Sequence, residues 1–149
     1  MIKISAALIC FNEQANIKRC LHSVGWCDEI VVVDSGSDDD TVGILHGFAK
    51  VKLFIRSFDD FAAQKNFAVQ KCSNEWVLSI DADEEVTGEL AQEILGLDFT
   101  CNGYFISRQN SFLGKWIYFG GWSPDYKLRL FNRKNAVWRG AIHETLFLE

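Results

Sequence analysis

Alternation of short apolar runs with helical patterns is the feature that most constrains the fold of this chain. Four runs suit buried strands and cover residues 4–11, 29–34, 51–55 and 75–81. The first intervening segment has helical spacing, because Ile17, Cys20, Leu21 and Val24 stand at i, i+3, i+4 and i+7. Continuous apolar strands alternating with helices are typical of a parallel sheet covered on both faces. The sequence therefore predicts an α/β fold.

Further helices are predicted to begin near Thr41, to include residues 61–69, and to follow Thr87 as a cap. After about residue 100 the pattern changes. Short strands are predicted at residues 104–108, 126–132 and 136–138. Residues 110–125 are rich in glycine and aromatic residues and are predicted to form a loop. We expect a small antiparallel addition to the sheet within a single domain of residues 1–149.

Composition excludes several classes of function. A formal net charge of −5 provides no basic field for nucleic acid. The five cysteines are odd in number and form no Cys-x-x-Cys pair, which indicates buried free thiols in a reducing compartment. No apolar stretch is long enough to span a membrane, so a cytoplasmic protein is expected, with attachment to a membrane surface left open.

Polar side chains follow three of the predicted strands. Asn12 and Glu13 follow the first, Asp34 ends the second, and Asp81 and Asp83 follow the fourth. Each alone could cap a helix or open a turn. Because ligands of open parallel sheets bind outside the carboxyl ends of the strands, their repeated position favours one shared site.

Asp81 and Asp83 are separated by one residue, so on an extended chain both carboxylates point the same way. Two such charges repel unless a cation neutralises them, and Mg²⁺ or Mn²⁺ suits oxygen ligands together with water and substrate phosphates. The D-x-D pattern alone is weak, since a solvated loop also explains it. No P-loop or G-x-G-x-x-G motif is present, and paired aspartates of the dehalogenase-like phosphatases would follow the first strand instead.

The order of these motifs resembles the family 2 glycosyltransferases, which have the GT-A fold. The matching stretches are ISAALICFNEQANIKRCLHSV, DEIVVVDSGSDDDTV, FAAQKNFAV, EWVLSIDADEEV, GGWSPDYKLRLF and a closing IHE. FAAQKNFA and GGWSPDYKLRLF are most similar to the bacterial lipopolysaccharide-core β-glucosyltransferase type. The resemblance implies an inverting, metal-dependent transfer of a sugar, expected to come from a UDP-hexose, to a saccharide or glycolipid acceptor in lipopolysaccharide or cell-surface glycan synthesis.

The resemblance also implies residue roles within a nucleotide-binding part (1–100) and an acceptor-side part (101–149). Residues expected to bind the nucleotide sugar are Phe11, Asn12, Glu13, Asp34, Lys65, Asn66, Asp81, Ala82 and Arg129. Asp83 is expected to ligate the metal, with Asp81 and His143 as further candidates. Glu84 and Glu85 are assigned to a solvated turn, and an indirect role at the metal is left open for Glu84.

Inversion requires a general base near the acceptor hydroxyl. Glu144 is favoured and His143 is expected to contact metal or phosphate, although exchanged roles and a purely structural histidine remain open. Asp125 is a weaker candidate, because Ser-Pro-Asp also suits a turn.

Acceptor contacts are expected from Arg108, Trp116 and Trp122. Arg108 and Lys115 could meet phosphates on such an acceptor. The alternatives are ordinary surface charge for these two residues and core packing for the aromatic residues of the loop. The aromatic residues considered for an acceptor-binding lid are Phe112, Trp116, Tyr118, Phe119 and Trp122, with glycines at 114, 120 and 121.

Relatives of this type generally continue beyond the His-Glu motif, whereas this chain ends at Glu149, so a truncated or short form is expected. Two other functions therefore stay open. One is a nucleotide-sugar-binding domain that is inactive alone or needs a partner chain. The other is a sugar nucleotidyltransferase, which is disfavoured because no glycine-rich, arginine-containing loop follows the first strand. Peripheral association with the inner membrane and homodimerisation are also left open.

Overall fold

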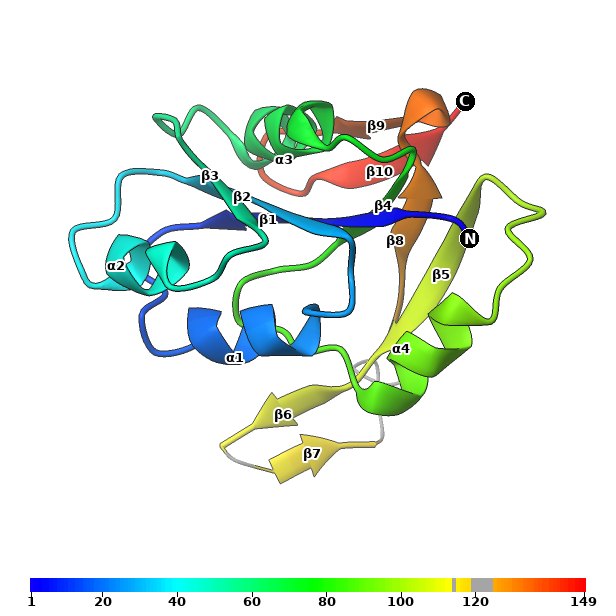
Figure 1. Cartoon of the computed structure of the whole chain (residues 1–149), viewed down its shortest axis with the longest axis horizontal. Coiled ribbons are helices and arrows are strands. Elements are labelled where there is room, and N and C mark those ends of the chain that lie inside the picture. The colour runs from blue at the N-terminus through cyan, green and yellow to red at the C-terminus, as the bar shows by residue number, and fades with distance from the viewer. Residues whose placement is uncertain (114, 119–124) are drawn as a thin grey trace.

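The computed structural model describes residues 1–113, 115–118 and 125–149, and its central element is a mixed sheet (Figure 1). The parallel strands are β1 (Ile4–Cys10), β2 (Glu29–Asp34), β3 (Val51–Ile55) and β4 (Trp76–Ser79). β5 (Gly103–Arg108) and β8 (Asp125–Asn132) extend this sheet. Within the described ranges the sheet has six strands in the order β3-β2-β1-β4-β8-β5. The four predicted apolar strands are thus confirmed.

The antiparallel addition is also confirmed. β8 runs antiparallel to β4, with Val77 opposite Phe131, and β5 runs antiparallel to β8. β9 (Ala136–Arg139) follows a 3-10 turn, η2 (Arg133–Asn135), and pairs with β10 (Thr145–Leu148) in a separate small sheet. The sequence pattern did not predict β10.

One expectation for this half of the chain is wrong in part. The predicted loop at residues 110–125 contains a hairpin of β6 (Asn110–Phe112) and β7 (Lys115–Ile117), which pair antiparallel. The sequence pattern did not predict these short strands, because asparagine, serine and glycine are typical of loops. Backbone pairing, and not apolar alternation, holds the two strands together.

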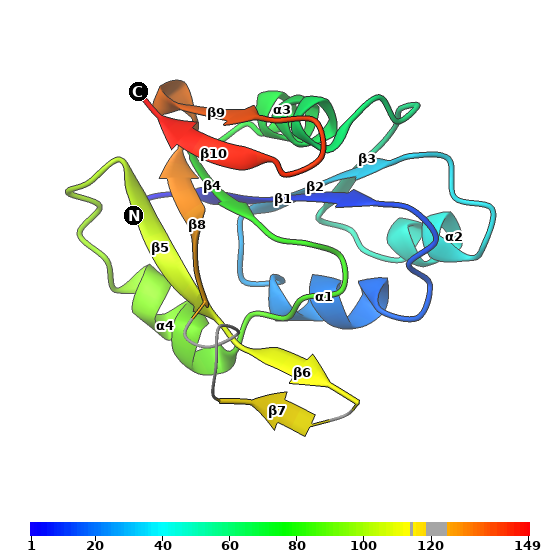
Figure 2. The same cartoon turned by 180° about the vertical axis from the view of Figure 1, so that it is seen from behind.

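Helices cover both faces of the sheet. α1 (Ile17–Ser23), α2 (Thr41–His46) and α4 (Gly88–Leu95) lie on one face, and α3 (Phe61–Lys71) lies with β9 and β10 on the other (Figures 1 and 2). Thr87 caps α4 as predicted, since its hydroxyl accepts a hydrogen bond from the Leu90 amide at 3.2 Å. Asp60 caps α3 in the same way through the Ala63 amide at 2.7 Å.

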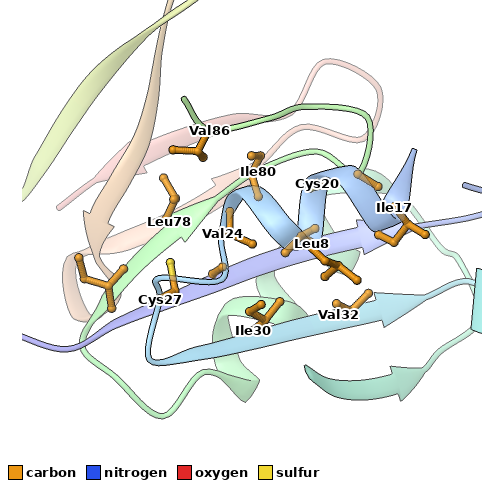
Figure 3. Close-up of a cluster of buried hydrophobic side chains, with 14 of the residues drawn as sticks. Leu8, Ile17, Cys20, Val24, Cys27, Ile30, Val32, Leu78, Ile80 and Val86 are labelled. Atoms are coloured by element: carbon orange, nitrogen blue, oxygen red, sulfur yellow. The ribbon is translucent and has the colours of Figure 1, made fainter. Parts of the chain in front are cut away.

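The core has two parts, one on each face of the sheet. Ile30 and Val32 of β2 face α1, whereas Val31 and Val33 face α3. Figure 3 shows the first part, in which side chains of α1 pack on those of β1, β2 and β4. Burial on both faces explains why residues 30–33 of β2 are all apolar, and the polar side chains of the site therefore lie at the strand ends.

Four of the five cysteines are buried and all five are free, as expected for Cys10, Cys20, Cys27 and Cys72 but not for the exposed Cys101. Burial raises the pKa of Cys20, Cys27 and Cys72 to about 12, so these thiols stay protonated. In the part of the chain that the structure describes, no helix has the length and hydrophobicity of a membrane span.

Candidate functional site

A pocket of about 760 Å³ lies at the carboxyl ends of β1 and β4. Its lining comes from the strand ends, from α3 and the segment before it, and from the β9–β10 connection. The lining residues are Ile9, Cys10, Phe11, Glu13, Ser35, Phe58, Phe61, Lys65, Asp81, Ala82, Asp83, Ile142 and Glu144. Seven residues predicted from the sequence thus share one pocket, namely Phe11, Glu13, Lys65, Asp81, Ala82, Asp83 and Glu144.

Lys65 joins two acidic groups of this pocket. Its Nζ lies 2.8 Å from Glu144 Oε1 and 3.2 Å from Asp81 Oδ1, and it also lies over the ring of Trp138, 4.6 Å from the centroid. The side chain of Lys65 is only 8% exposed. Because α3 buries the aliphatic stem, the ammonium group is held between the two carboxylates.

Arg129 binds the other side of Asp81. Its Nη2 donates to Asp81 Oδ2 at 2.9 Å and to Glu84 Oε1 at 3.1 Å. Burial acts to raise the pKa of the Asp81 carboxyl, but Arg129 and Lys65 more than offset this, and the pKa falls to about 2. Burial acts to lower the pKa of Arg129, yet Asp81 and Glu84 raise it on balance. Asp81 is therefore ionised and held between two cations.

Asp83 differs from Asp81 in its surroundings. It is exposed, lines the pocket, and has no hydrogen-bond or ion-pair partner among the described residues. In the described ranges no three acidic, histidine or cysteine side chains form a cluster suited to a metal. An unpaired carboxylate facing a pocket nevertheless fits a divalent cation of the Mg²⁺ type, which commonly takes one or two protein carboxylates together with water and phosphate oxygens.

The loop after β2 is built around Asp34, which is fully buried. Asp34 Oδ1 accepts hydrogen bonds from the amides of Gly36 at 2.9 Å and Ser37 at 2.8 Å, and Oδ2 accepts from the Ser37 hydroxyl and the Cys10 thiol. Gly36 has a φ of +92°, which favours glycine. Asp34 does not line the pocket, so the structure places it in support of the loop and gives no contact for a base or ribose.

Asn12 is tied to the same loop. Its amide donates to the Ser37 hydroxyl at 2.8 Å, and its Oδ1 accepts from the Asp38 amide at 3.0 Å. Its φ of 52° lies in the left-handed region, which asparagine tolerates better than most residues. Asn12 therefore shapes the wall beside Phe11 and Glu13 without lining the pocket itself.

Asn66 has a different position from the one expected. Its Nδ2 donates to the Trp138 carbonyl and its Oδ1 accepts from the Trp138 amide, both at 2.9 Å. Both ends of the side-chain amide thus fasten β9 to α3, and Asn66 does not line the pocket. Spacing on the helix could not reveal this, because β9 is about seventy residues distant in the sequence.

Arg108 and Asp125 form a cross-strand ion pair between β5 and β8. Arg108 Nη2 lies 2.7 Å from Asp125 Oδ2, and Arg108 Nη1 lies 3.4 Å from Glu84 Oε1. Partial burial acts to raise the pKa of Asp125, but Arg108 and Lys127 lower it on balance. Neither residue lines the pocket, and a carboxylate with a lowered pKa is a poorer base. The arrangement does not support Asp125 as the general base.

Two further predicted residues, His143 and Trp116, are not brought into the pocket. His143 is exposed and does not line it, although its neighbours Ile142 and Glu144 do. Trp116 is 58% exposed on the β6–β7 hairpin. This hairpin projects on the side of α1 and α4, whereas α3 and β9–β10 lie on the other side (Figures 1 and 2). Trp122 lies outside the described residues, as do residues 114 and 119–121 of the expected lid.

Glu84 was assigned to a solvated turn, and this assignment is wrong. The Asp81 amide donates to Glu84 Oε2 at 2.9 Å, while Glu84 Oε1 accepts from Arg129, and the side chain is only 21% exposed. Glu85, in contrast, is 48% exposed and pairs with Arg19, as expected for a solvated residue. The three-residue spacing from Asp81 to Glu84 was the available signal, because it allows the chain to turn back on itself.

The aromatic side of the pocket was also not predicted. Phe58 and Phe61 pack edge to face, with ring centroids 5.0 Å apart, and each is nearly half exposed. Phe58 lies in the segment that joins β3 to α3 and Phe61 is the first residue of α3, and both line the pocket together with Asp81 and Asp83. Residues 56–61 read RSFDDF and follow neither the helix nor the strand period, so the sequence pattern gave no signal for them.

Residues 5–144 match the family model described as Glycosyl transferase family 2. The lipopolysaccharide core biosynthesis glycosyltransferase LpsC of Rhizobium meliloti (strain 1021) is 33% identical over 120 residues, which cover 76% of this chain and 44% of LpsC. An uncharacterized glycosyltransferase of Rickettsia typhi (strain ATCC VR-144 / Wilmington) is 37% identical over 97% of this chain and 51% of its own length. The chain spans about half the length of these curated relatives.

A solved structure shares the fold. S. aureus TarS 1–349 in complex with UDP-GlcNAc superposes with a TM-score of 0.53 and 25% identity, over 63% of this chain and 30% of that chain. The complex of the same protein with UDP gives a TM-score of 0.56 and 24% identity, over 63% of this chain and 31% of that chain. The fold is the expected GT-A fold, and the family match extends over nearly the whole chain. The chain belongs to glycosyl transferase family 2.

Proposed function

We propose that this chain binds a nucleotide-diphospho-sugar in the pocket at the ends of β1 and β4 and transfers the sugar to an acceptor. The observation that carries the proposal is the joint position of Lys65, Asp81, Asp83 and Glu144 in one pocket of about 760 Å³. This volume lies within the range of about 300 to 1,000 Å³ that is usual for small-molecule sites. TarS, which shares the fold, is solved with UDP-GlcNAc.

The donor proposed is a UDP-hexose. Phe11, Phe58 and Phe61 offer apolar and aromatic surface for the base, since each is partly exposed and lines the pocket. Lys65 and Arg129 provide positive charge around Asp81, where the ribose and diphosphate are expected. A growing negative charge on the leaving diphosphate would be stabilised by such fixed cations.

Asp83 is proposed to hold Mg²⁺ or Mn²⁺ through its unpaired carboxylate. Such an ion would neutralise charge on the diphosphate when bound. Asp81 is less available, because both its oxygens already contact cationic side chains. His143 is not proposed as a ligand, since it does not line the pocket.

Glu144 is proposed as the general base of an inverting transfer. It lines the pocket, and its carboxylate accepts from Lys65. A base must reach the acceptor hydroxyl. As the acceptor oxygen forms the new glycosidic bond, the bond from the sugar to the diphosphate breaks, UDP leaves, and the hydroxyl proton moves to a Glu144 oxygen. Before this step, on donor binding, Lys65 would shift its contact from Glu144 to the donor diphosphate and leave Glu144 free to take the proton.

The acceptor is proposed to be a saccharide or glycolipid of lipopolysaccharide or cell-surface glycan synthesis. Support comes from LpsC, whose name places it in lipopolysaccharide core biosynthesis. We assign residues 1–100 to the donor side and residues 101–149 to the acceptor side, with Arg108 and Trp116 near the acceptor. A cytoplasmic location at the inner membrane and a homodimer accompany this proposal.

Calorimetry with UDP in the presence and absence of Mn²⁺ tests the donor site. We expect UDP to bind, and to bind more tightly with Mn²⁺. Absence of binding in both conditions would contradict the proposal. Where UDP binds, incubation with UDP-glucose and a saccharide acceptor separates a transferase from a binding module, because only transfer makes UDP release depend on the acceptor.

A further inference from the structure

The Asp81–Glu84 turn is closed by a pair of reciprocal hydrogen bonds. The Glu84 amide donates to the Asp81 carbonyl at 3.0 Å, and the Asp81 amide donates back to Glu84 Oε2 at 2.9 Å. A capping box likewise has a glutamate side chain that accepts from the amide three residues before it, but there the return bond goes to a side-chain oxygen, whereas here it goes to the Asp81 carbonyl. Ala82 and Asp83 lie inside this closed turn, so its geometry decides where the Asp83 carboxylate points.

The second oxygen of Glu84 faces β8 and β5. Glu84 Oε1 accepts from Arg129 Nη2 at 3.1 Å and lies 3.4 Å from Arg108 Nη1. Arg129 Nη2 is shared between this oxygen and Asp81 Oδ2. The guanidinium of Arg129 is therefore oriented from two sides, and its side chain is only 11% exposed.

Glu84 itself does not line the pocket. It acts on the pocket through the backbone of the Asp81–Asp83 turn and through Arg129, which does not line the pocket either but donates to Asp81. Loss of its charge would leave Asp81 as the one carboxylate in an ion pair with Arg129 among the described residues, and the Arg129 side chain would move towards Asp81. Loss of its acceptor would free the Asp81 amide and loosen the turn that carries Asp83.

We infer that Glu84 is a positioning residue of the donor site, which holds the Asp83 carboxylate towards the pocket and keeps Arg129 beside Asp81. This inference rests on the proposed function, since it concerns how the same pocket binds a metal ion and a nucleoside diphosphate. It assigns separate tasks to two adjacent glutamates, because Glu85 is solvated and pairs with Arg19.

The test compares Glu84→Gln and Glu84→Ala with Glu85→Gln. Glutamine keeps an oxygen for the Asp81 amide but removes the charge that faces Arg129, and alanine removes both. Glu85→Gln makes the same change of net charge one residue away. For each variant, electron paramagnetic resonance titration measures the apparent Kd for Mn²⁺ in the presence of UDP, and calorimetry measures the Kd for UDP with and without Mn²⁺.

We expect the Mn²⁺-dependent gain in UDP affinity to fall about tenfold in Glu84→Ala and about threefold in Glu84→Gln. Glu85→Gln should stay within about twofold of the wild type, and UDP binding without Mn²⁺ should change less than binding with Mn²⁺ in both Glu84 variants. A purely structural role would weaken UDP binding equally with and without Mn²⁺. The ratio of the two Kd values therefore separates a positioning role from a role in folding.

Three outcomes would overturn the inference while leaving the proposed function intact. Glu84→Ala could bind UDP with the same Mn²⁺-dependent gain in affinity as the wild type. Both Kd values could rise in parallel in the Glu84 variants. The melting transition could be lost in Glu84→Gln, which would make the residue a requirement of the fold. Failure of the wild type to bind UDP would instead contradict the proposed function.

Discussion

Lys65 and Glu144 meet across the pocket, with Lys65 Nζ 2.8 Å from Glu144 Oε1. Lys65 comes from α3, whereas Glu144 comes from the connection between β9 and β10. The same ammonium also lies 3.2 Å from Asp81 Oδ1, so one cation joins the helix, the end of β4 and the late connection. The catalytic candidate and the acidic turn are therefore held together by Lys65.

Replacement of Lys65 by methionine should lower the free energy of unfolding by about 2 kcal/mol or more, because two carboxylates would lose their shared partner. Partial exposure of Asp81 keeps the loss below that of a fully buried pair. Urea denaturation measures the change. Lys127→Met is the control, since Lys127 is half exposed and pairs with Asp125 at the surface, and it should cost about 1 kcal/mol or less. Equal losses in the two variants would contradict the central role of Lys65.

The two aspartates of the D-x-D motif should behave differently when each is changed to asparagine. Asp83→Asn should leave unfolding free energy within about 0.5 kcal/mol, because Asp83 has no partner among the described residues, but it should abolish the effect of Mn²⁺ on UDP affinity. Asp81→Asn should cost about 1 to 2 kcal/mol, since Arg129 and Lys65 both lose a charged acceptor. Thermal melting and UDP calorimetry measure both. A stable Asp81→Asn and an unstable Asp83→Asn would reverse this assignment.

Glu144→Gln should reduce acceptor-dependent release of UDP from UDP-glucose by at least about 100-fold, because an amide cannot accept the proton. UDP affinity should be retained, since Lys65 becomes free to contact the diphosphate. His143→Asn is the matched control, as His143 is adjacent but does not line the pocket, and its rate should fall less than about tenfold. If the histidine variant lost the larger share of the rate, the two roles would have to be exchanged.

Ionisation of Glu29 should make the free energy of unfolding depend on pH in acidic solution. Burial acts to raise the pKa of the Glu29 carboxyl, but hydrogen bonds from Lys52, Ser5 and Ser73 lower it to about 2 from an ordinary value of 4.5. The folded state therefore favours the ionised form. The resulting stability is present above about pH 5 and is lost as pH falls towards 2, and it amounts to about 2 to 3 kcal/mol.

Urea denaturation of the wild type and of Glu29→Gln at several pH values between about 6 and 3 measures this contribution. The difference between the two proteins should shrink as the pH falls, because the glutamine cannot titrate. Other carboxylates act on both proteins alike and cancel in the difference. A difference that stays constant over this range would show that the contacts of Glu29 do not depend on its charge.

Phe131→Ala should lower the free energy of unfolding by about 3 to 5 kcal/mol, because Phe131 is fully buried between β8, β4 and α3 and its loss leaves a cavity. Phe105→Ala on the neighbouring strand is the control. Phe105 is 67% exposed, so its loss should cost about 1 kcal/mol or less. Chemical denaturation of both variants measures the contrast, and similar losses would mean that the face carrying Phe105 is covered in solution.

The local order of apolar and polar residues was sufficient to predict the parallel sheet and the edge of the sheet at which the pocket lies. An uninterrupted apolar run such as residues 30–33 can be satisfied only when both faces of a strand are covered, and polar side chains are then displaced to the strand ends. For the same reason Glu13, Asp81 and Asp83 could be placed at one edge before any contact was known. The β6–β7 hairpin carried no such pattern, since it buries little apolar surface.

Roles within the pocket depended on contacts between segments distant in the sequence. Asp34 lies at a strand end, as Asp81 does, but its oxygens are hydrogen-bonded within its own loop. Asn66, next to Lys65, is hydrogen-bonded to the backbone of β9. Glu84 and Glu85 are chemically identical, yet only Glu84 meets Arg129. A carboxylate or amide is available to a ligand only when no nearer partner saturates it, and the nearest partner is set by which strands and loops the tertiary fold brings together.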